Sequence, residues 1–66
     1  MLLKIDASKA VNISREYLKQ SYTTVTFKNI VMEEKLWIVE CNVGFLYDNI
    51  KKVKIDADSG KIISCV

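Results

Sequence analysis

The segment VKIDADSGKI, residues 53–62, alternates apolar and charged residues and then breaks into small polar ones. Alternation with a period of two is typical of a strand with one buried face, and it predicts a strand over residues 50–57. Asp58-Ser59-Gly60 predicts a three-residue hairpin loop, because Gly60 can adopt the left-handed conformation that such a loop requires. A final strand is therefore expected to return alongside this one.

The length of this loop sets the register of the hairpin. A three-residue loop pairs Ile55 with Ile63 and Val53 with Cys65. Because side chains alternate between the faces of a strand, all four are expected on one face, directed toward the core.

Two more strands are predicted upstream, over residues 23–31 and 35–43. Both are rich in β-branched and aromatic residues, which favour extended backbone. A turn at Glu33-Glu34 joins them. The second strand is expected to direct four side chains inward: Trp37, Val39, Cys41 and Val43.

The pairing of these two strands requires an irregularity. If Phe27 stays on the same face as Trp37, strict alternation also turns the polar Asn29 toward the core. A β-bulge near Asn29 is therefore expected, because one extra residue turns Ile30 inward instead.

Residues 7–19 precede the strands and show a helical period. Asp6 is placed to cap this helix, because its carboxylate can accept from the free backbone N–H groups of the first turn. Ser14 lies within the apolar stripe, where its hydroxyl can bond to the carbonyl four residues earlier. The stripe expected to face the sheet consists of Ala7, Ala10, Val11, Ser14, Tyr17 and Leu18.

These elements predict an α+β fold, in which one N-terminal helix packs on a three- to four-stranded antiparallel β-meander. The chain has 66 residues, half of them hydrophobic, so we expect a single domain over residues 1–66. A core this small rarely contributes more than ~3–5 kcal/mol of net stability.

The overall charge does not point to a particular class of partner. Ten Lys and Arg residues against eight Asp and Glu residues leave a formal charge of +2, which predicts no general attraction to nucleic acid or to anionic membranes. No apolar run is long enough to span a membrane. A cytoplasmic protein is expected from the chain as given, or an extracellular or membrane-associated one if a signal or anchor has been trimmed.

The inventory for chemistry is sparse, because the chain has no His, no Gly-rich phosphate loop and no nucleophile paired with a base. No enzyme activity, metal site or cofactor is expected. Cys41 and Cys65 are both expected to point into the core. With the strands in chain order, these two residues lie two strands apart, roughly 9–10 Å. That separation predicts two free thiols rather than a disulfide.

Four aliphatic residues are expected on the outer face of the sheet, away from the helix: Leu36, Ile38, Ile62 and Val66. If they form one contiguous patch, they indicate a partner surface. Single aliphatic residues scattered on a surface are also ordinary, so both interpretations remain open at this stage.

Three segments, together with the order of a helix followed by a meander, resemble the PepSY domain family. They are IDASKAVNIS at residues 5–14, LWIV at 36–39 and VKIDADSGKI at 53–62, and the last is the most specific. Ser14 stands where the family usually has a small apolar residue. The resemblance implies the same α+β fold. It also implies a role in inhibiting or regulating peptidases, and it carries over no catalytic residues.

The expected function is therefore that of a non-catalytic protein-binding module, and a peptidase is one partner class. The alternative is a structural domain that self-associates into a homodimer through its sheet edges or outer faces.

Overall fold

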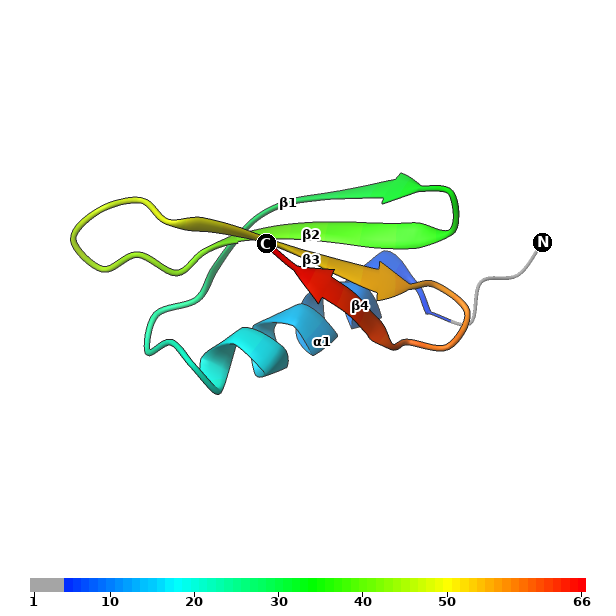
Figure 1. The fold of residues 1–66 in the computed structure, drawn as a ribbon, viewed down its shortest axis with the longest axis horizontal. Helices are drawn as coiled ribbons and strands as arrows, with labels where there is room; N and C mark the ends of the chain where they lie inside the picture. The colour runs from blue at the N-terminus through cyan, green and yellow to red at the C-terminus, as the bar shows by residue number, and fades with distance from the viewer. Residues whose placement is uncertain (1–4) are drawn as a thin grey trace.

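The computed structural model describes residues 5–66 and has one helix packed on one face of a four-stranded antiparallel sheet (Figure 1). The strands lie in chain order, β1-β2-β3-β4, so each one pairs with its neighbour in sequence. The predicted α+β fold is confirmed, with four strands. The elements are α1 (Ala7–Lys19), β1 (Thr26–Glu33), β2 (Leu36–Asn42), β3 (Ile50–Asp56) and β4 (Ile62–Cys65).

Helix α1 begins and ends where the sequence predicts. The Asp6 carboxylate accepts a hydrogen bond from the Lys9 backbone N–H at 2.8 Å, as an N-cap does. The Ser14 hydroxyl donates to the Ala10 carbonyl at 3.0 Å, so this buried polar group is satisfied within the helix. Ala10, Ser14 and Leu18 are the buried positions. Tyr17, expected in the core stripe, is exposed instead.

The β1–β2 turn lies one residue later than predicted. Its two central residues are Glu34 and Lys35, not Glu33 and Glu34, and both have positive φ, at 48° and 67°. That is the type I′ pattern, whose twist matches the twist of the paired strands. The expected bulge is confirmed by a register shift between Phe27 and Asn29.

The β3–β4 connection has four residues rather than the predicted three. Gly60 has a φ of 79°, which confirms its left-handed conformation. The Asp56 N–H donates to the Lys61 carbonyl at 2.9 Å, and this bond closes the loop. The Asp56 carboxylate lengthens the turn, because it accepts from the backbone N–H groups of Asp58 and Ser59 at 2.7 and 3.2 Å.

Because the loop is longer, the register of β4 differs from the predicted one. Ile62, and not Ile63, lies opposite Ile55. Ile63 is then the extra residue of a bulge, and it restores the predicted pairing of Val53 with Cys65. Ile62 therefore faces the helix, whereas the sequence placed it on the outer face.

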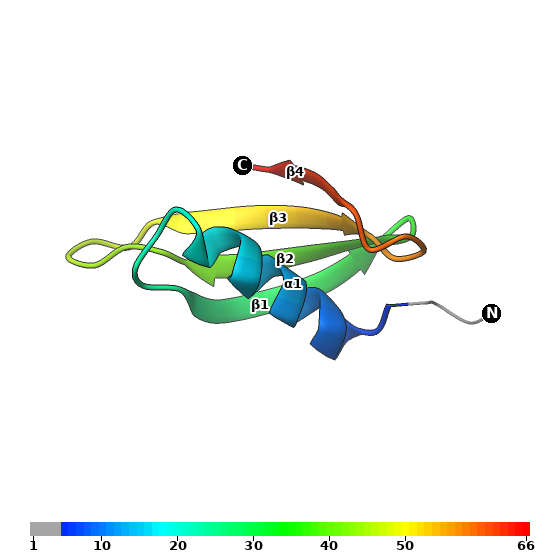
Figure 2. The same ribbon diagram turned by 90° about the horizontal axis from the view of Figure 1, so that it is seen from below.

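The core lies between α1 and the inner face of the sheet (Figure 2). Ile5 covers one end of it, because its N–H donates to the Ala57 carbonyl at 3.2 Å and its carbonyl accepts from Trp37 Nε1 at 2.9 Å. Within residues 5–66, no helix has the length and apolar character needed to cross a membrane. The buried hydrophobic cluster consists of Ile5, Ala10, Leu18, Val39, Cys41, Val43, Val53 and Ile55.

Candidate functional site

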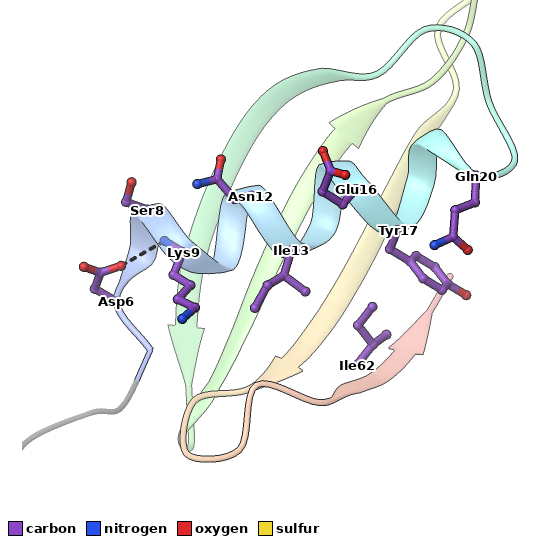
Figure 3. A pocket seen from close by; sticks show the side chains of 9 residues that line it. All are labelled: Asp6, Ser8, Lys9, Asn12, Ile13, Glu16, Tyr17, Gln20 and Ile62. Atoms are coloured by element: carbon purple, nitrogen blue, oxygen red, sulfur yellow. Dashed lines mark hydrogen bonds between the residues drawn. The ribbon is translucent and has the colours of Figure 1, made fainter.

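A groove of about 640 Å³ lies between α1 and the edge strand β4 (Figure 3). It exists because the helix packs mainly over β1 and β2 and leaves the inner face of β4 uncovered (Figure 2). Ile13, Tyr17 and Ile62 supply its apolar surface. Its polar lining consists of Asp6, Ser8, Lys9, Asn12, Glu16 and Gln20.

The three apolar residues meet for separate local reasons. Ile13 and Tyr17 are four residues apart, so they lie on the same side of the helix. Ile62 joins them because the four-residue loop turns it toward the helix. Sequence reasoning missed this groove, since it assigned Tyr17 to the core and Ile62 to the opposite face of the sheet.

The backbone of β4 adds hydrogen-bonding capacity beside the groove. Val66 and Lys52 exchange two backbone hydrogen bonds, both of 2.9 Å. Because residues of an antiparallel strand bond alternately to one side and the other, the neighbouring Cys65 directs its N–H and C=O away from β3. Those groups face the open edge of the sheet, where another strand can pair with them.

This edge has no charged residue to protect it against pairing. Sheet edges are commonly protected by charged residues, Pro or bulges. The other edge strand, β1, contains Lys28 and Glu33, whereas β4 contains no charged residue. The protective features of β4 are its length of four residues and the bulge at Ile63, whose own side chain is exposed.

The structure divides the predicted partner surface between the two faces of the sheet. Leu36, Ile38 and Val66 lie on the outer face, and Ile62 lies in the groove on the other side. Ile38 is only 9% exposed, whereas Val66 is 71% exposed. Outer-face residues line a hollow of about 330 Å³: Val31, Glu33, Ile38, Glu40, Lys52, Lys54 and Val66.

The two cysteines are free and differ in environment. Cys41 is buried, and burial raises the pKa of its thiol above the ordinary 9.0. The charge of Arg15 opposes that rise, and Cys65 adds to it. Cys65 lies opposite Val53 as predicted but is exposed, because the helix does not cover β4. The expectation that both thiols point into the core is therefore wrong for Cys65.

Across residues 5–66, no three His, Cys, Asp or Glu side chains lie close enough together to hold a metal ion. The ionisable side chains that line the groove are Asp6, Lys9, Glu16 and Tyr17. Its surface thus combines apolar contacts with a charged rim.

No family model matches this chain, and no curated protein or solved structure matches it either.

Proposed function

We propose that this chain is a non-catalytic protein-binding module that receives an extended segment of its partner along β4. The observation that carries the proposal is the uncharged edge strand lying directly beside an open apolar groove. Strand addition draws affinity from backbone hydrogen bonds and specificity from pockets for alternate side chains. At this edge, the outward backbone groups of β4 can supply the hydrogen bonds and the groove can supply the pocket.

The added segment lies antiparallel or parallel to β4 and bonds to the outward N–H and C=O of Cys65. Every second side chain of such a segment points to the helix side of the sheet. There it contacts Ile13, Tyr17 and Ile62, so the site favours a segment with an apolar residue at that position. The intervening side chains point to the outer face and are less restricted.

Two partner classes fit this site. The resemblance to PepSY domains favours a peptidase, in which an extended surface segment pairs with β4. The alternative is a second copy of this chain, because an uncharged edge such as β4 can also pair with itself across a twofold axis.

Peptide display followed by chemical-shift mapping tests the proposal. Extended peptides selected on the immobilised protein should shift the backbone amides of Ile62–Cys65 and the side chains of Ile13 and Tyr17. Ile63→Lys places a charge on the edge and should weaken binding at least about tenfold. Val31→Lys makes the same change on the opposite edge strand and serves as the matched control.

Shifts confined to β1, or an Ile63→Lys variant that binds as tightly as the parent, would rule out this site. Sedimentation of the chain alone separates the partner classes. A monomer indicates a different protein as partner, and a dimer lost in Ile63→Lys indicates self-association. Inhibition of purified peptidases by the parent, but not by Ile63→Lys, would assign the peptidase class.

A further inference from the structure

The β2–β3 loop projects from one end of the molecule (Figure 1). Within residues 5–66, it carries the most exposed of the large apolar side chains. Phe45, Leu46 and Tyr47 are 84%, 80% and 84% exposed. A contiguous apolar cluster that is largely exposed to water usually marks a surface that contacts something else. We call these three residues the tip.

The loop holds the tip outward through specific contacts. Asn42 connects its two arms, because the Oδ1 atom accepts from the N–H groups of Gly44 and Asn49 at 2.9 and 3.1 Å. The Nδ2 atom of Asn42 donates to the Asp48 carboxylate at 2.9 Å. A Cβ atom at Gly44 would overlap the Tyr47 carbonyl oxygen, so the arms approach as closely as glycine permits. The tip is therefore exposed by an organised loop.

The end of the molecule that carries the tip is basic. The strand register places Lys51 opposite Cys41 and Lys52 opposite Glu40, and helix α1 also runs toward this end (Figure 2). Lys54, opposite Ile38, lies on the other side of the strand centre. The cations at the tip end are Arg15, Lys19, Lys28, Lys51 and Lys52, and its carboxylates are Glu16, Glu40 and Asp48.

The opposite end has the reverse balance, because it contains the helix N-cap and the two tight turns. Within residues 5–66, its carboxylates are Asp6, Glu33, Glu34, Asp56 and Asp58, and its cations are Lys9, Lys35, Lys54 and Lys61. Among residues 5–66, cations therefore exceed carboxylates at the tip end and do not at the other end. The apolar tip stands at the positive end.

We propose that the tip docks on an anionic lipid bilayer, with its three side chains at the boundary between headgroups and acyl chains. Phe and Leu side chains favour the apolar side of that boundary, and the amphipathic Tyr ring favours the headgroup level. The cations around the base of the loop then face the anionic headgroups. A bilayer closes around a convex tip from all sides, whereas a protein partner would need a matching cavity for three consecutive side chains.

The proposal is independent of the peptide site on β4, and vesicle flotation tests it directly. We expect the protein to float with vesicles containing roughly 30% phosphatidylserine and not with vesicles of phosphatidylcholine alone. Added salt should weaken this binding, because the lysines act through screened charge. Leu46→Asp should reduce vesicle affinity roughly 10- to 100-fold, since burial of the leucine is lost and a charge opposes insertion.

Matched variants separate insertion from simple charge attraction. Lys52→Glu at the tip end should weaken vesicle binding, whereas Lys61→Glu at the opposite end should leave it nearly unchanged. Ile63→Ser removes an exposed apolar side chain away from the tip and should leave it unchanged too. A polarity-sensitive fluorophore at Leu46→Cys, in a Cys65→Ser background, should shift to the blue on vesicles, and one at Lys61→Cys should not.

Failure to bind phosphatidylserine vesicles would overturn the proposal, as would full binding by Leu46→Asp. A photoreactive group at the tip that captures a protein instead of lipid would overturn it as well. Circular dichroism of each variant confirms that the fold is intact, which is expected because these side chains face water. Loss of vesicle binding with intact peptide binding shows that the two sites are separate.

Discussion

Gly60→Ala places a side chain where the backbone disfavours one. The φ of Gly60 is 79°, and a left-handed conformation costs an L-residue roughly 1–2 kcal/mol. The new Cβ would also collide with Cδ1 of the buried Ile5. Cδ1 is the far end of a flexible side chain, so a change of its rotamer relieves the collision at a cost of roughly 0.5–1.5 kcal/mol. The sum of about 1.5–3.5 kcal/mol is a large part of the ~3–5 kcal/mol that a core of this size supplies.

A double-mutant cycle with Ile5→Val separates the two costs, because valine lacks the Cδ1 atom that the new Cβ meets. Ile5→Val alone should cost about 0.5–1.5 kcal/mol. In that background, Gly60→Ala should cost only the strain of roughly 1–2 kcal/mol. Urea titration gives each free energy of unfolding, and a stabilising osmolyte in all samples keeps the weakest variant folded.

Two results would refute this reasoning. A Gly60→Ala cost below about 0.5 kcal/mol would mean that the loop does not hold this residue in the left-handed region. An equal cost in the parent and in the Ile5→Val variant would mean that Ile5 does not cover the loop.

Three further predictions concern the core and the thiols. Ala10→Asp should leave no cooperative thermal unfolding transition, because it places an unpaired carboxylate at a buried position, at a cost of several kcal/mol. A normal thermal melt would contradict the contact between helix and sheet. Maleimide should modify Cys65 in the native protein and Cys41 only after denaturation, and mass spectrometry of digested samples would show equal labelling if the burial difference is absent. Because burial raises the pKa of Cys41, the folded chain keeps that proton after the unfolded chain loses it, so the free energy of unfolding should fall as pH rises above about 9.0. Urea titrations across that range should show a smaller fall in Cys41→Ala.

The sequence was a reliable guide where local physics determines the structure. Asp6 and the apolar period that follows it determine the helix bounds. Alternation around Trp37 and Val53 determines which faces of the central strands are buried. The bulge near Asn29 was also predictable, because the unbulged register would bury a polar amide.

The sequence was a poor guide where a difference of one residue in the position or length of a turn changed the structure. Glu34 and Lys35 lack the Asn-Gly signature of a type I′ turn, so the turn was predicted one residue early. The Asp56 carboxylate lengthens the next loop by bonding inside it, and that change moves Ile62 to the other face. The groove followed from this change and from the path of the helix over β1 and β2, which no local pattern determines.

The chain-order sheet has a consequence for how this protein folds. Each strand pairing joins neighbours in sequence, so the β1–β2 and β3–β4 hairpins can close on the microsecond scale, at about 1–10 μs each. The bonds from Ile5 to Trp37 and to Ala57 instead join residues that are far apart in sequence, so they close long loops. We therefore expect the meander to assemble early and the contacts of Ile5, just before the helix, to form last. The single tryptophan lies at that closing point, so its fluorescence reports the final step of folding.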